Sequence, residues 1–236
     1  MGFLALGNAH GNQGMHDQIL ALKWIQSEIE YFGGNPKNVT IMGESAGAMS
    51  CLLHLVSPLS QGLFQKIIAT SGSPSTPFGH LDRKPFCYGR VFARHLLRKK
   101  LKNRKITDEK LLKMLKEMPA KTIVRNTTVF KDFDIPFPLQ WKPSLDPESN
   151  EPFMPISFDE AVKQGKFDKN IPIMMGCTSE EGLIFSTSLV RSPKRWQMLF
   201  DQWNHWAPLL LFNRYNKYMD FDQSFTIRSH QILLHR

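Results

Sequence analysis

The sequence predicts an α/β protein with a mostly parallel sheet and covering helices, and three observations lead to this fold class. Short apolar, β-branched segments of strand length alternate with segments whose apolar residues recur at helical spacing. The connections between them are short, as in parallel strands joined by right-handed crossovers with helices on both sheet faces. One strand passes into a helix through a sharp turn that holds Ser45 between two glycines. At 236 residues the chain is long enough for one large domain or two small ones.

The elements follow one another regularly over the first 74 residues. Gly33-Gly34 supplies the left-handed stop of the first helix. The segment before Ser45 is β-branched, whereas the segment after it has helix-favouring composition. The predicted elements are a strand end at 2–6, a helix at 17–32, a strand from 39, a helix from 46 to about 57 and a strand at 66–71.

The regular alternation breaks between residues 78 and 170. A basic helical region comes first, and a Pro-rich, aromatic segment from Phe133 to Pro143 follows. We expect 78–170 to be a cap-like insertion within a single partial α/β domain, 1–236, whose aromatic side chains either line a substrate wall or pack in the core. A strand resumes at Ile171–Gly176. The paired acids Glu180 and Glu181 follow it, at the sheet edge where α/β proteins bind ligands.

The stretch around Ser45 has the G-x-S-x-G pattern of a nucleophile elbow. Gly43 and Gly47 flank the serine at the spacing that a tight strand-to-helix turn requires, because side chains there would collide with the turn or the neighbouring strand. A serine needs a base to become nucleophilic at neutral pH, and the base needs an orienting acid. Glu180 and Glu181 are both candidates for that acid, since each follows a predicted strand after Ser45.

Several longer motifs accompany the elbow, and together they closely resemble the type B carboxylesterase family, which includes the cholinesterases. They cover most of the first 78 residues, and the resemblance resumes at 171–182. The motifs are Gly11–Gln18, Ala21–Trp24, Phe32–Pro36, Val39–Ile41, Gly43–Gly47 and Ser71–Pro74. The resemblance implies a partial α/β-hydrolase fold. It also implies hydrolysis of small-molecule carboxylic esters by serine acylation and deacylation, with no cofactor and no metal.

The resemblance assigns roles to individual residues. Ser45 is then the nucleophile, and Glu181 rather than Glu180 is the triad acid. The backbone N–H of Ala46 would be one donor of the oxyanion hole. Glu44 matches a supporting acid beside the site.

Two further positions match the family pattern. Ser71 matches a second serine near the acid, and Phe78 matches an aromatic residue that lines the acyl pocket. Turn capping or simple packing explains both residues equally well.

The triad base has no clear candidate. Only His205, His230 and His235 follow Glu181, and none lies in the family's Gly-x-x-His-type loop. We expect His54, on the helix after the elbow, to be a packed histidine. The family's N-terminal strands and Gly-Gly oxyanion loop also have no match. We therefore expect the chain to be the middle of a longer protein and, alone, a weak or inactive esterase. The alternative is a non-catalytic cholinesterase-like adhesion or binding protein.

The net charge of +9 is concentrated in one part of the chain. Fifteen of the 30 Lys and Arg lie between Arg83 and Arg125, against three acids. The run Arg98–Lys105 leads into a helix capped by Thr107. A solvated basic face is one interpretation, and an anionic surface or partner is the other. No aromatic residue interleaves the run, so we do not expect a nucleic-acid partner.

The remaining sequence features concern the compartment. Three cysteines without a CxxC pair predict neither a zinc site nor a disulfide framework, and they leave a single disulfide pair open. No segment is long enough to cross a bilayer, and the N-terminus has no signal-peptide pattern. The family resemblance implies secretion or the ER lumen. Glycosylation sequons at Asn38 and Asn126 are compatible with that location.

Overall fold

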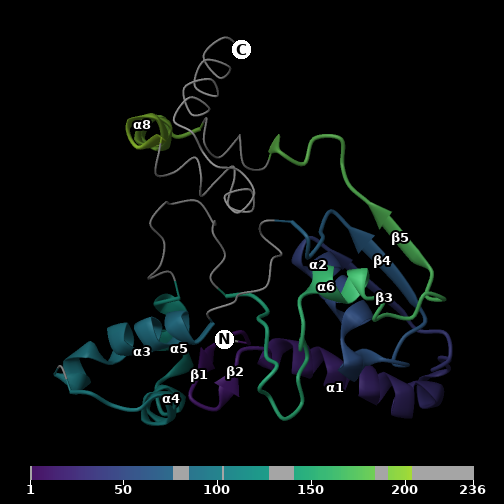
Figure 1. The fold of residues 1–236 in the computed structure, drawn as a ribbon, viewed down its shortest axis with the longest axis horizontal. Coiled ribbons are helices and arrows are strands. Elements are labelled where there is room, and N and C mark those ends of the chain that lie inside the picture. Colours follow the sequence, from purple (N-terminus) through teal and green to yellow (C-terminus); the bar gives the residue numbers. More distant parts are fainter. Residues whose placement is uncertain (1, 77–84, 103, 128–140, 184–190, 204–236) are drawn as a thin grey trace. The chain divides into compact units, whose positions relative to one another are not determined.

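The computed structural model describes residues 2–76, 85–102, 104–127, 141–183 and 191–203 (Figure 1). The chain divides into two compact units, one of Met1–Phe130 with Leu139–Ser179 and the other of Lys131–Pro138 with Glu180–Arg236. In the second unit the structure describes the helix α8, Pro193–Asp201, on which the Trp196 and Phe200 rings meet edge to face at 4.9 Å. The elements described below belong to the first unit.

A three-stranded parallel sheet forms the centre of the first unit, as the sequence predicts. Its strands are β3 (Thr40–Glu44), β4 (Lys66–Thr70) and β5 (Ile173–Gly176), in the order β3-β4-β5. The helix α2 (Ala46–Val56) packs on β3 and β4, and α6 (Phe158–Lys163) packs on α2 (Figure 1).

One face of this sheet carries the larger hydrophobic core. Ile67 and Ala69 of β4 point into it and are buried, together with the α2 residues Leu52 and Leu53. The long helix α1 (Gln13–Glu28) adds Met15, Ile19 and Leu22 to the same core. Side chains alternate between the two faces of a strand, so this face takes every second residue of β4.

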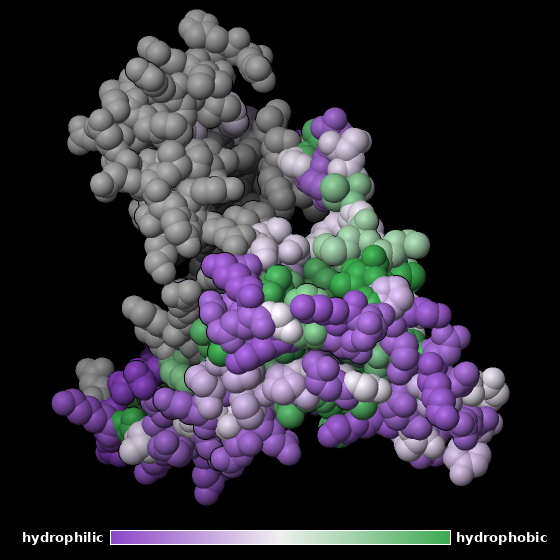
Figure 2. Space-filling model, turned by 45° about the vertical axis from the view of Figure 1, so that its right-hand side comes forward, coloured by the Kyte–Doolittle hydropathy of each residue, from purple (hydrophilic) through white to green (hydrophobic). Residues whose placement is uncertain are grey.

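Among the described residues the other face of the sheet is largely exposed, contrary to the expectation of helices on both faces. The register aligns Met42, Ile68 and Met174 in one row across the three strands. Met42 is 73% exposed and Met174 69% exposed. Figure 2 shows apolar residues gathered on the surface that carries these strands. We call the row Met42–Ile68–Met174 the open row.

The N-terminal segment differs from the sequence expectation in detail. A hairpin of β1 (Ala5–Leu6) and β2 (Ala9–His10) closes around Gly7, whose φ is 57°. The elements predicted from the sequence include none where β2 lies, because two-residue strands show no hydrophobic periodicity. The first helix begins at Gln13 rather than Asp17 and ends in a 3-10 turn, Ile29–Phe32. Gly33 follows with φ 77°, which confirms the predicted left-handed stop.

Three helices build a separate layer on the hairpin. They are α3 (Pro85–Leu101), α4 (Asp108–Lys116) and α5 (Ala120–Arg125). Both α3 and α4 contact β1, and a second hydrophobic core lies between them. Its buried members are Leu4, Leu6, Phe92, Ala93, Leu97, Leu101, Leu111, Leu112 and Leu115. We call α3, α4, α5 and the described segments that join them, 85–102 and 104–127, the helical layer.

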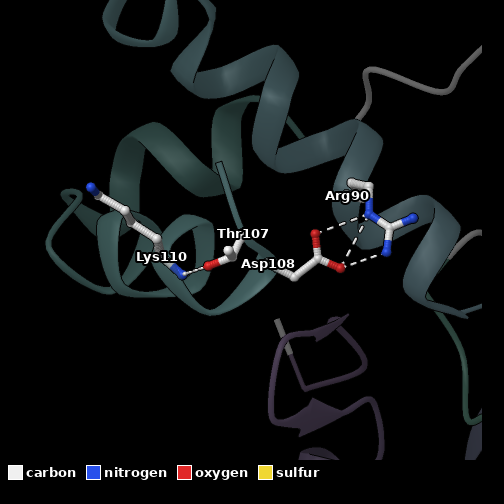
Figure 3. A network of polar contacts seen from close by, with 4 residues as sticks. All are labelled: Arg90, Thr107, Asp108 and Lys110. Atoms are coloured by element: carbon white, nitrogen blue, oxygen red, sulfur yellow. Dashed lines mark hydrogen bonds and ion pairs between the residues drawn. The ribbon is translucent and has the colours of Figure 1, made fainter. Parts of the chain in front are cut away.

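The start of α4 confirms the predicted cap. The Thr107 hydroxyl accepts a hydrogen bond from the Lys110 N–H at 3.4 Å (Figure 3). Beside it the Arg90 guanidinium of α3 binds Asp108 through two nitrogens, with Nη2 2.6 Å from Oδ2. The Arg90 guanidinium and, further away, Arg94 hold the pKa of Asp108 below its usual value.

A long-range clip ties the 144–154 segment to the N-terminal part. The Asn12 amide donates to the Ser144 carbonyl at 2.9 Å, and the Ser144 N–H donates to the Asn12 side-chain oxygen at 3.0 Å. The buried Asp146 carboxylate accepts from the N–H groups of Phe153 and Met154. Most of the Pro-rich segment that precedes this clip lies outside the described residues.

Candidate active site

Ser45 lies between β3 and α2 in a conformation that non-glycine residues rarely adopt, with φ 53° and ψ −116°. Its N–H donates to the Thr70 carbonyl at 2.9 Å, and its own carbonyl accepts from the Met49 N–H at 3.0 Å. Because both sides of the residue are tied to neighbouring elements, the turn cannot relax locally. The residue is exposed, and its hydroxyl does not cap α2. The structure thus confirms the predicted sharp turn from strand to helix.

The two glycines of the elbow differ. A Cβ at Gly43 would overlap the backbone of Gly47 and lie 2.7 Å from the Ala48 nitrogen, so this position requires glycine. A Cβ at Gly47 would meet no heavy atom within 4 Å among the described residues. The expectation that both glycines avoid a collision is therefore wrong for Gly47. Gly47 already lies in the first turn of α2, and a Cβ there would project into open space.

A third glycine, Gly72, has the close contact that the sequence analysis missed. A Cβ there would overlap the Ser45 carbonyl oxygen and lie 2.9 Å from the carbonyl carbon. It would also lie 3.1 Å from the Cβ of Ala48. Gly72 therefore packs directly on the backbone of the elbow. The sequence did contain a signal for this contact, because Gly72 closely follows the predicted strand that lies beside the elbow strand.

The strand register brings Ser71 to the elbow. Glu44, Thr70 and Gly176 lie in one row at the carboxyl ends of β3, β4 and β5. Ser45 and Ser71 each follow directly after this row. Ser71 also has a positive φ, 55°, and its N–H donates to the Gly176 carbonyl at 2.8 Å. The structure thus places both predicted serines at the same edge of the sheet.

Glu44 and Ala46 flank the serine on either side. Glu44 is exposed at the end of β3, and Ala46 is the first residue of α2. The first N–H groups of a helix have no acceptor within the helix, and they lie at its partly positive end. The Ala46 N–H can therefore stabilise negative charge on a group bound beside Ser45.

The remaining site predictions lie elsewhere. Glu181 is exposed in a turn of the second unit. Phe78 falls outside the described residues, as do His205, His230 and His235. The structure therefore brings together Glu44, Ser45, Ala46 and Ser71.

His54 is a packed histidine, as expected. It is 3% exposed, and its two ring nitrogens lie 2.7 Å from the Ser60 hydroxyl and 3.0 Å from the Gln18 side-chain oxygen. Burial lowers the pKa of His54 to about 4, so the ring is neutral at pH 7. It lies nine residues along α2 from Ser45, which is roughly 13 Å at the rise of an α-helix. His54 is therefore placed to stabilise the core and not to deprotonate Ser45.

No cluster of three or more His, Cys, Asp or Glu side chains among the described residues could hold a metal ion. None of the helices in the described ranges has the length and apolar character needed to cross a bilayer.

Comparison with known proteins identifies the family. The model of the carboxylesterase family matches residues 1–231. A carboxylic ester hydrolase of Bombus ignitus is 34% identical over 212 residues, which are 89% of this chain and 36% of that protein. Esterase FE4 of Myzus persicae is 33% identical over 218 residues, which are 91% of this chain and 36% of that protein.

Two solved structures have the same fold. A PNB esterase superposes with a TM-score of 0.64 at 32% identity, over 78% of this chain and 37% of the esterase. A thermophilic PNB esterase superposes with the same TM-score at 25% identity, over 89% of this chain and 47% of the esterase.

The comparisons bear on three expectations. The family match runs to residue 231, well past Gly182, where the visible motifs end. The relatives named here are esterases, which gives the non-catalytic alternative no support. The chain spans little more than a third of the length of these two curated relatives. This chain belongs to the carboxylesterase family and has the α/β-hydrolase fold.

Proposed function

We propose that this chain carries the nucleophile of a serine carboxylic ester hydrolase, and that Ser45 is that nucleophile. The observation that carries the proposal is the backbone of Ser45. A non-glycine residue in such a conformation costs about 1–3 kcal/mol, and it persists only where the surroundings hold it. Two backbone hydrogen bonds and the contact with Gly72 hold it here. A strained backbone is expected if the serine hydroxyl must project from the sheet edge to reach a substrate.

The proposed reaction has two steps. The Ser45 hydroxyl oxygen attacks the ester carbonyl carbon while a base takes its proton, and the Ala46 N–H stabilises the resulting oxyanion. The tetrahedral intermediate collapses, and the alcohol leaves with the proton from the base. Water then attacks the acyl-serine by the same route in reverse and releases the carboxylic acid.

The other predicted residues have supporting roles in this proposal. Glu181 follows the end of β5 by five residues and would orient the base as the triad acid. Glu44 and Ser71 would support the nucleophile and the acid, and Phe78 would line the acyl pocket. The base is left unassigned, because His54 lies roughly 13 Å along α2 from Ser45 and its lowered pKa of about 4 makes it a weak base.

The proposal also limits the rate of ester hydrolysis that we expect from this chain. Without a triad base, an oxyanion hole and binding alone leave a rate only about 10³ to 10⁴ above that in water. We therefore propose that the chain acts as a weak esterase or needs further segments of a longer protein for full activity.

We also propose glycosylation at Asn38, which is exposed in the turn before β3. Release of mass by an N-glycosidase from secreted protein would test that site.

Labelling with a fluorophosphonate, followed by peptide mass mapping, tests the assignment of Ser45. We expect the label on the peptide that contains Ser45, and no label on that peptide in the Ser45→Ala variant. Ser50→Ala is the matched control, because Ser50 lies one turn further along α2 and its hydroxyl binds the Ala46 carbonyl. A wild-type chain that is not labelled, or is labelled at other serines to the same extent, would count against an activated Ser45.

A further inference from the structure

The helical layer carries the whole net positive charge of the chain. Among its described residues, 85–102 and 104–127, there are thirteen Lys and Arg and three Asp and Glu. The full chain has a net charge of +9, so the rest is close to neutral. The charge is therefore a property of one surface.

Seven of these basic residues form a continuous group. The exposed members are Arg94, Arg98, Lys99, Lys100, Lys102, Arg104 and Lys105. Asp108, at the start of α4, binds Arg90 in the first half of α3. The connection after Leu101 must therefore run back along α3, which places Lys102, Arg104 and Lys105 beside the end of that helix. We call this group of seven the basic surface.

The shape of the basic surface is convex. Successive residues of a helix point about 100° apart, and Arg98, Lys99 and Lys100 are all exposed. The end of α3 thus presents charge around more than half of its circumference. The remaining side of α3 is held by the buried residues Leu97 and Leu101.

Local stability does not account for so much charge. Cations in the last turn of a helix stabilise its negative end, but the effect is confined to that turn. Arg94 and Arg98 lie four residues apart on α3, and like charges at this spacing destabilise a helix by a few tenths of a kcal/mol. The ion pair between Arg90 and Asp108 lies outside the basic surface.

The chemistry of the basic surface favours a fluid anionic surface as its partner. Four to eight Lys and Arg on an amphipathic helix are typical of binding to anionic phospholipids, whose headgroups can gather beneath a convex patch. Single-stranded nucleic acids need aromatic residues for stacking, and 94–105 holds none of Phe, Tyr or Trp. The long apolar stems of Lys and Arg also suit the interface between water and lipid.

We propose that the basic surface docks this protein peripherally on membranes that contain anionic phospholipids. The attraction is electrostatic and long-ranged, and it requires no change at Ser45. It is independent of the proposed esterase activity. Each basic residue near such a membrane contributes about a fivefold increase in partitioning.

The experiment measures co-sedimentation of the full chain with phosphatidylcholine/phosphatidylserine vesicles and with pure phosphatidylcholine vesicles. The test variant combines Arg98→Gln, Lys99→Gln, Lys102→Gln and Lys105→Gln. The control variant combines Lys23→Gln, Lys37→Gln, Lys163→Gln and Lys166→Gln, which are also exposed and leave the same net charge. Both sets of residues lie on the surface. Circular dichroism of each variant is the check that the substitutions leave it folded.

We expect the wild-type chain to bind only the anionic vesicles and to dissociate as salt is raised above about 0.1 M. The test variant should lose on the order of 10²- to 10³-fold in partitioning, while the control changes by less than about threefold. Equal losses in both variants would overturn the proposal, since net charge alone would then explain binding. Failure of the wild type to bind anionic vesicles at low salt would overturn it too. Tighter binding to duplex DNA or heparin than to the vesicles would replace it with a polyanion partner.

Discussion

Two regions of the first unit expose different kinds of feature, namely the carboxyl edge of the sheet and the outer surface of the helical layer. At the carboxyl edge, Ser45 and Ser71 have positive φ values, and Gly72 packs on the backbone of Ser45. On the helical layer, flexible Lys and Arg side chains stand in solvent, and Arg90 joins Asp108 in an exposed ion pair. The edge is suited to hold one hydroxyl in a fixed direction. The helical layer is suited to attract an extended anionic surface.

The largest effect should come from the backbone contact at the edge. Gly72→Ala would place a Cβ against the Ser45 carbonyl group, and because neither side is a flexible side chain, we expect a loss of about 3 kcal/mol in unfolding free energy. Gly47→Ala is the matched control and should instead stabilise the chain by about 0.5–1 kcal/mol, since its site is open and helical. Urea unfolding measures both. Equal effects of the two substitutions would show that the edge tolerates movement.

The interior beneath the edge should respond to pH through His54. Its pKa is about 4 in the folded chain and about 6.5 in the unfolded chain, so between these values the unfolded chain binds more protons. Stability is then complete above about pH 6.5 and falls as the pH drops toward 4, by roughly 3 kcal/mol in total. Unfolding curves across this range measure the slope, and His54→Gln should remove it. An unchanged slope in the variant would assign the effect to other groups.

A smaller effect should follow from relief of the strained turn. Ser45→Gly allows the positive φ at no steric cost, so we expect a gain of about 1 kcal/mol in stability together with loss of fluorophosphonate labelling. Ser45→Ala should lose the labelling without this gain. Thermal unfolding distinguishes the two variants. A glycine variant less stable than the alanine variant would mean that the turn stores no strain.

The smallest effect should occur on the helical layer. Arg90→Gln removes an ion pair in which Arg90 is half exposed, and we expect a loss of no more than about 1 kcal/mol that shrinks at high salt. The pKa of Asp108 is lowered by Arg90, so the contribution is present at neutral pH and disappears as the pH falls through that lowered pKa. Arg125→Gln serves as an exposed control. A loss as large as that from Gly72→Ala would erase the energetic difference between the two regions.

Local patterns predict much of this fold. The strands around residues 40 and 67, the helix after Ser45, the cap at Thr107 and the glycine stop at Gly33 all depend on residues close together in the sequence. Hydrophobic periodicity and turn chemistry report such features directly. The elbow belongs to the same class, since its strand, turn and helix are consecutive.

Other features depend on contacts between distant segments, and the sequence could not specify them. The overlap that Gly72 avoids arises because β4 lies beside β3 in a particular register. The open space at Gly47 follows from the direction in which a Cβ would project at the start of α2. The β1–β2 hairpin has two residues per strand, too few to show an alternating pattern. The open face of the sheet could likewise not be predicted, because its strands have the composition of covered ones.

The open row has a chemical consequence of its own. Thioether sulfur is oxidised readily where it meets solvent, and the sulfoxide is polar and chiral. Met42, Met174 and the neighbouring Met175 are exposed, whereas Met15 and Met154 are buried in the core. Mild peroxide should therefore add oxygen to Met42, Met174 and Met175 before Met15 and Met154, which mass spectrometry of peptides would show. Such treatment would turn an apolar sheet face into a polar one while the core beneath it stays intact.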